Sequence, residues 1–128
     1  MPALQDPVVY IVDDDDDARD STLELLKAAG CMVHGFASGR EFLEKYDSSG
    51  RGCIVLDLQM PDISGFQLLN TLRALGNTIP VVIFTGRTDP ITKNFAERSG
   101  AAALLAKPVD HNELVELVQS LINPNPRG

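Results

Sequence analysis

Five short apolar runs alternate with stretches of helical periodicity along almost the whole chain. The runs are rich in β-branched residues, and the first, residues 8–12, is apolar at every position. A strand that is apolar on both faces is typical of a parallel sheet covered by helices on both sides. The sequence therefore predicts an α/β fold, a doubly wound five-stranded parallel sheet with five helices. The predicted strands are 8–12, 32–37, 53–56, 81–84 and 103–106.

The predicted helices carry start and end signals. N-cap side chains are expected before four of them, at Ser38, Ser64, Asp89 and Asp110. The two serines are each followed three residues later by the partner of a capping box, Glu41 and Gln67. Glycines in the left-handed conformation are expected after three helices, at Gly30, Gly76 and Gly100.

The net charge and the composition of the chain's segments limit the partners and the cellular location expected for such a domain. The chain has 128 residues and a net charge of −7, which repels nucleic acid and anionic membranes. No apolar run approaches the roughly 20 residues of a membrane span, and residues 1–7 lack the features of a signal peptide. We expect a cytoplasmic domain over residues 8–122, with an N-terminal lead at 1–7 and a linker-like tail at 123–128.

Polar residues that can carry chemistry stand at the ends of four predicted strands. Asp13 and Asp14 follow the first strand, Asp57 the third, Thr85 the fourth and Lys107 the fifth. The carboxyl ends of parallel strands lie at one edge of a sheet, where such folds bind ligands. We therefore expect these side chains to converge in one shallow site. The acidic run continues to residue 17, where further aspartates are expected to serve the helix N-terminus.

Such a group of side chains is suited to phosphoryl capture. Crowded carboxylates repel one another, and a hard divalent cation relieves this repulsion through oxygen ligands. Mg²⁺ is the expected ion, with Mn²⁺ as an alternative. A carboxylate can attack phosphorus to form an aspartyl phosphate. The side chains of Thr85 and Lys107 can then contact phosphoryl oxygens.

The order of these residues resembles the receiver family of two-component response regulators, over residues 8–122. Segment 57–65 is similar to the family pattern D-x-x-M-P-x-x-x-G. The remaining motifs occupy the other strand ends in the family's order: Asp13-Asp14, Thr85-Gly86 and Lys107-Pro108. Each motif alone is weak, but together, in order, they are specific.

The resemblance implies a flavodoxin-like sheet with strand order 2-1-3-4-5 and a phosphoryl site at one edge. Asp57 is implied as the phosphoacceptor, and Thr85 and Lys107 as contacts of the phosphoryl group. The peptide bond between Lys107 and Pro108 is implied to be cis.

The resemblance also implies a metal site and a signalling role. Its Mg²⁺ ligands would be Asp14, Asp57 and the backbone carbonyl of Gln59, with Asp13 acting through a metal-bound water. The phosphoryl donor would be a sensor histidine kinase or a histidine phosphotransfer protein. The domain would catalyse only its own phosphorylation and slow dephosphorylation, contact no nucleic acid or membrane directly, and switch an output surface. A homodimer that forms on phosphorylation is an open alternative.

Four residues call for separate interpretation. Leu104 stands where the family often has an aromatic residue, and Arg87 stands two residues after the site threonine, where it is expected to shield an acyl phosphate from water. Cys31 and Cys53 open strands that the implied order makes second neighbours, about 9–10 Å apart. A disulfide requires Cα atoms within about 7 Å, so both are expected to be buried thiols.

Two other classes use related folds or chemistry. A phosphatase of the haloacid dehalogenase class also forms an aspartyl phosphate, and Asp13-x-Asp15 mimics its D-x-D motif. Two features argue against this class. Asp17 stands where that class has threonine or valine, two residues after the second aspartate, and the chain is too short for a cap domain. A flavodoxin-like flavin carrier needs a phosphate cradle rich in serine, threonine and glycine after the first strand. This chain has five aspartates there. The gene's full reading frame would show whether a helix-turn-helix output domain follows.

Overall fold

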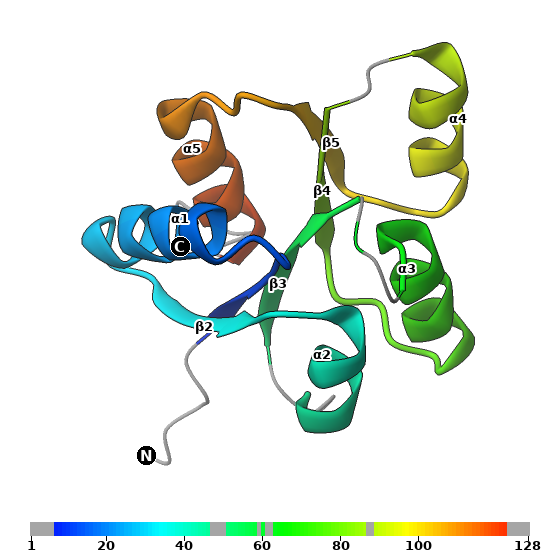
Figure 1. Ribbon diagram of the computed structural model, residues 1–128, viewed down its shortest axis with the longest axis horizontal. Helices are drawn as coiled ribbons and strands as arrows, with labels where there is room; N and C mark the ends of the chain where they lie inside the picture. Colours follow the sequence, from blue (N-terminus) through cyan, green and yellow to red (C-terminus); the bar gives the residue numbers. More distant parts are fainter. Residues whose placement is uncertain (1–6, 47–50, 59, 61–62, 87–88, 123–128) are drawn as a thin grey trace.

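The computed structural model describes residues 7–46, 51–58, 60, 63–86 and 89–122. Its elements alternate strictly along the chain, as predicted (Figure 1). The strands are β1 (Val8–Val12), β2 (Met32–Phe36), β3 (Gly52–Asp57), β4 (Val81–Thr85) and β5 (Ala103–Ala106). The helices are α1 (Asp16–Ala28), α2 (Gly39–Lys45), α3 (Gly65–Ala74), α4 (Pro90–Arg98) and α5 (His111–Ile122).

The strands form one parallel sheet in the order β2-β1-β3-β4-β5, which confirms the predicted fold. β1 lies between β2 and β3, so the chain reverses its direction of winding next to β1. In Figure 1, α1 and α5 cover one face of the sheet, and α2 and α3 cover the other. This reversal places the carboxyl ends of β1 and β3 beside each other, where a doubly wound fold binds its ligand.

The fully apolar strands supply two cores, one on each face, because successive side chains point to opposite sides. Val9 and Ile11 of β1 pack in the core under α1 and α5, whereas Tyr10 and Val12 pack in the core under α2 and α3. Leu26 of α1 is the deepest residue of its helix, with no exposed surface. Burial on both faces accounts for the absence of polar alternation in these strands.

Helix ends follow the sequence signals. The Ser64 capping box is complete, and all four predicted N-cap side chains accept the expected N–H. At α2, the Glu41 carboxylate accepts from the N–H of Ala37, 2.8 Å away and one residue before the cap. Positive φ angles occur at the three predicted glycines, Gly30, Gly76 and Gly100.

The two cysteines are free thiols, as predicted. Cys53 is fully buried in β3, but Cys31 is only partly buried, because it precedes the edge strand β2. Burial raises the pKa of the Cys53 thiol to about 12. Within the described ranges, every helix is too short or too polar to cross a membrane.

Candidate functional site

The predicted site residues gather at the carboxyl edge of the sheet. Asp13 directly follows β1, Asp57 and Thr85 are the last residues of β3 and β4, and Lys107 directly follows β5. These four strands are consecutive neighbours in the sheet, so their ends lie side by side. Thr85 is fully buried, and its carbonyl accepts a hydrogen bond from the N–H of Lys107 at 2.8 Å.

Three carboxylates meet at this edge. Asp13, Asp14 and Asp57 each offer a ligand oxygen, and these oxygens lie within 4.8 Å of one another. Asp13 and Asp57 are only 4% and 6% exposed, whereas Asp14 is exposed. An all-oxygen donor set with one open side suits a hard divalent cation that keeps several of its waters, as Mg²⁺ does.

The electrostatic state of Asp13 reflects this crowding. Its pKa is raised above the usual range, chiefly by burial and further by the negative charges of Asp57 and Asp14. A hydrogen bond from the N–H of Asp15 and the charge of Lys107 act in the opposite direction. A cation placed among these carboxylates would relieve the repulsion.

Lys107 provides the positive charge of the site. Its Nζ lies 3.1 Å from Oδ1 of Asp57, a contact that joins residues 50 positions apart. The lysine side chain is 40% exposed, so its ammonium group is held at the surface end of the buried carboxylate. The Lys107–Pro108 peptide bond is cis, as the family resemblance implied.

The Asp57 segment is held by the start of α3. The N–H of Gly65 donates to the carbonyl of Leu58 at 2.9 Å, and the N–H of Leu58 donates to the carbonyl of Phe84 at 2.9 Å. A Cβ at Gly65 would lie 2.9 Å from Cα of Leu58 and 3.0 Å from the carbonyl oxygen of Asp57. The glycine of the family pattern therefore allows α3 to begin in contact with the backbone of the acceptor.

The loop after β1 is held by a residue that the sequence did not single out. Nη1 of Arg19 donates to the carbonyl of Asp13 at 2.8 Å, and Nη2 lies 2.6 Å from Oδ1 of Asp16. The only sequence signal was the i, i+3 spacing of Asp16 and Arg19, which indicates a surface ion pair and not a contact with the site. Of the other predicted residues, Gln59 and Arg87 lie outside the described residues. Leu104 is partly buried against the core under α2 and α3.

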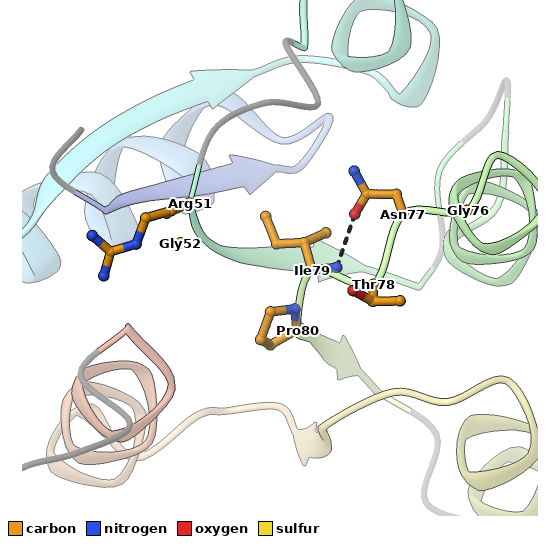
Figure 2. A pocket seen from close by; sticks show the side chains of 7 residues that line it. All are labelled: Arg51, Gly52, Gly76, Asn77, Thr78, Ile79 and Pro80. Atoms are coloured by element: carbon orange, nitrogen blue, oxygen red, sulfur yellow. Dashed lines mark hydrogen bonds between the residues drawn. The ribbon is translucent and has the colours of Figure 1, made fainter. Parts of the chain in front are cut away.

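A separate pocket of about 370 Å³ lies at the opposite edge of the sheet, where β3 and β4 begin (Figure 2). Asn77 Oδ1 accepts from the N–H of Ile79 at 2.8 Å, and the Arg51 side chain points away from this turn. The seven lining residues include no carboxylate, histidine or cysteine, so this pocket lacks the acid–base groups of the carboxyl edge.

A doubly wound parallel sheet with an acidic cluster and a lysine at its carboxyl edge defines a class of phosphoryl-accepting signalling domains. The family model for the response regulator receiver domain matches residues 9–119, and the chain belongs to this family. This membership decides against the phosphatase and the flavin carrier.

Individual relatives agree with the family assignment. The chain is 38% identical over 112 residues to the transcriptional regulatory protein FixJ of Azorhizobium caulinodans, covering 88% of this chain and 53% of FixJ. It is similar in structure to the response regulator StyR, with a TM-score of 0.86 and 34% identity over 95% of this chain and 62% of StyR. The structure titled FixJ-N gives a TM-score of 0.83 and 33% identity, covering 94% of this chain and 96% of that one. The chain spans about half the length of the curated relatives it matches.

Proposed function

We propose that this receiver domain accepts a phosphoryl group on Asp57. The observation that carries the proposal is the site itself, where three carboxylate oxygens lie within 4.8 Å and the Lys107 ammonium lies 3.1 Å from Asp57 Oδ1. Crowded carboxylates beside one ammonium suit a reaction that brings in a divalent cation and a phosphoryl group together.

The contacts of the three carboxylates favour Asp57 as the nucleophile. Asp13 accepts from the N–H of Asp15, which ties it to its own loop. Asp14 is exposed, whereas Asp57 ends β3 at the centre of the sheet and touches Lys107. A carboxylate oxygen of Asp57 would bond to phosphorus while the bond from phosphorus to the donor breaks, and the bonding pair would leave with the donor. The donor would depart as acetate from acetyl phosphate, or as a neutral imidazole whose nitrogen takes a proton from water when the donor is a phosphohistidine.

The remaining strand-end residues would bind the metal and the phosphoryl group. Asp14, Asp57 and the Gln59 carbonyl would hold Mg²⁺, or Mn²⁺ in its place, with Asp13 reached through a bound water. The ion would supply positive charge against the developing negative charge on phosphoryl oxygens. Lys107 would move its ammonium from Asp57 Oδ1 to a phosphoryl oxygen, and the hydroxyl of Thr85 would donate to another.

The partners and the extent of the domain follow from the family and the charge. The donor would be a sensor histidine kinase or a histidine phosphotransfer protein, and the domain would turn over no other substrate. With a net charge of −7, this domain is unsuited to direct contact with nucleic acid. Because the relatives are about twice as long and include transcriptional regulatory proteins, a DNA-binding output would lie outside it. The receiver domain would span residues 8–122, with an N-terminal lead at 1–7 and a linker-like tail at 123–128. Phosphorylation would change an output surface or promote a homodimer.

The test uses acetyl phosphate with Mg²⁺ and intact-mass spectrometry. Wild type should gain the mass of one phosphoryl group, and Asp57→Asn should gain none. Asp14→Asn is the matched variant within the cluster, and it should still be labelled, more slowly, at high Mg²⁺. Full labelling of Asp57→Asn, or no labelling of wild type at any Mg²⁺ concentration, would contradict the proposal.

A further inference from the structure

We propose that Arg19 is a positioning residue for the metal site, and that it sets the affinity for a divalent cation through the backbone of Asp13 and Asp14. The inference rests on the proposed function, since it concerns the metal site of that reaction. Arg19 lies in α1 and touches none of the three carboxylates in the described contacts. Its contact with the site is the hydrogen bond from Nη1 to the carbonyl of Asp13, at 2.8 Å.

The carbonyl of Asp13 belongs to the peptide unit that joins Asp13 to Asp14. A peptide unit is planar, so holding its oxygen fixes the plane from which the Asp14 backbone continues. The next peptide unit is held as well, because the N–H of Asp15 donates to Asp13 Oδ1 at 3.0 Å. The backbone of Asp14 is therefore fixed on both sides, although its side chain is exposed.

The side chain of Arg19 is itself held in place by packing against β2. Its side chain is only 16% exposed, whereas that of its partner Asp16 is 79% exposed. The aliphatic stem lies against β2, where a Cβ at Gly35 would come within 3.3 Å of Cδ of Arg19. The strand therefore leaves room for the arginine stem, and the guanidinium group reaches the Asp13 carbonyl from a packed position.

Positioning and simple electrostatics predict opposite effects of removing this residue. A positive charge close to a cation site repels the cation, so its removal alone would strengthen Mg²⁺ binding. Loss of a hydrogen bond that orients metal ligands without touching the metal weakens metal binding, by about 10-fold at the lower end of measured cases. The sign of the change in affinity therefore distinguishes the two roles.

The experiment measures Mg²⁺ affinity by isothermal titration calorimetry of the whole chain. Arg19→Met should bind Mg²⁺ about 10-fold more weakly than wild type. Arg19→Lys keeps the charge but loses the two-armed contact, so it should also bind more weakly than wild type. Asp16→Asn and the control Lys27→Met, which removes a positive charge from the far end of the same helix, should stay within about twofold.

Acetyl phosphate labelling supplies a second measurement that a general loss of structure would not reproduce. In Arg19→Met, the Mg²⁺ concentration for half-maximal labelling rate should rise by the same factor as the dissociation constant. The rate at saturating Mg²⁺ should stay within about twofold of wild type, since binding and not chemistry has changed. A lower rate at every Mg²⁺ concentration would overturn the positioning role.

The outcomes separate this inference from the proposed function. If wild type neither binds Mg²⁺ nor becomes labelled, the proposed function fails. If wild type does both and Arg19→Met binds Mg²⁺ equally or more tightly, the inference about Arg19 fails alone. If Arg19→Met does not fold, Arg19→Lys decides, and affinity equal to wild type in that variant refutes the positioning role.

Discussion

Replacing Asp13 by asparagine should stabilise the metal-free domain, although the change removes a residue of the site. Asp13 is 4% exposed, and its ligand oxygen lies within 4.8 Å of those of Asp14 and Asp57. Asparagine has nearly the same shape and can still accept the hydrogen bond from the N–H of Asp15. The substitution therefore removes a buried charge from a crowded anionic cluster with little change in packing.

The magnitude follows from the spacing of the charges. The ligand oxygens of Asp13 and Asp57 lie no more than 4.8 Å apart, and two negative charges at that limit repel by about 3.5 kcal/mol at an effective dielectric constant near 20. The pair with exposed Asp14 is nearer the aqueous limit, about 1 kcal/mol. Attraction to Lys107 is lost, and the hydrogen bond to a neutral amide is weaker by about 1 kcal/mol. A net gain of about 1–2 kcal/mol is expected, which raises the melting temperature by about 3–8 °C.

The gain should depend on pH in a defined direction. Burial, with help from neighbouring negative charges, raises the pKa of Asp13 in the folded state above the ordinary value of an aspartate. At a pH below that ordinary value, the Asp13 carboxyl is protonated in both the folded and the unfolded state, so its charge does not lower the stability of the folded state. As pH rises through the folded-state pKa, wild type loses stability that Asp13→Asn keeps. The difference between the two proteins should therefore be smallest at acidic pH and should grow as pH rises through the folded-state pKa of Asp13.

Urea denaturation with EDTA and with saturating Mg²⁺ measures both effects. In EDTA at neutral pH, Asp13→Asn should have the higher free energy of unfolding. In Mg²⁺, wild type should gain more stability than the variant, because the cation relieves the repulsion that asparagine has already removed. A variant that is less stable than wild type in EDTA, or a difference that does not change with pH, would refute the electrostatic reasoning.

Three further predictions concern packing, thiol chemistry and the lifetime of the phosphorylated state. Gly65→Ala should lose about 1–3 kcal/mol of stability and should be labelled more slowly, because the new methyl group would meet the backbone at the end of β3. The control Gly86→Ala should melt close to wild type, because its methyl group would have no neighbouring atom within 4 Å. In native protein, Ellman's reagent should react faster with Cys31 than with Cys53, whose thiol is buried and has a pKa of about 12, and equal rates would contradict that burial. Arg87→Ala should hydrolyse its acyl phosphate faster than wild type after removal of the donor, and an equal or slower decay would exclude the shielding role.

The fold could be predicted because the apolar runs mark the strands almost to the residue. The errors occur where hydrogen bonding and hydrophobicity diverge. β3 continues to polar Asp57, because the ladder to β4 extends as far as the bond from Leu58 N–H to Phe84. β2 ends at Phe36, one residue earlier than expected, and the N–H of Ala37 is taken by the Glu41 carboxylate at the start of α2.

The site could be predicted to the extent that its side chains stand at strand ends. Topology alone brings Asp13, Asp57 and Lys107 together, so the sequence pattern was sufficient for them. Arg19 was missed because its contact is with a backbone carbonyl, which leaves no pattern of side-chain types. The role of Gly65 could likewise not be predicted from the sequence. The family pattern contains this glycine but does not show that it lies against the backbone of Asp57 and Leu58.

The balance of charge at the site links its stability to its proposed chemistry. The ammonium group of Lys107 contacts Asp57, and the N–H of Lys107 is bonded to the carbonyl of Thr85, the last residue of β4. On the proposed function, phosphorylation would convert the Asp57 carboxylate into an acyl phosphate and transfer the interaction of Lys107 to the phosphoryl oxygens. The ammonium group would then leave Asp57 Oδ1, while the N–H of Lys107 can stay bonded to the carbonyl of Thr85. We therefore expect phosphorylation to act first on the end of β4 and on the segment between β5 and α5, because Lys107 belongs to that segment and is bonded to the end of β4.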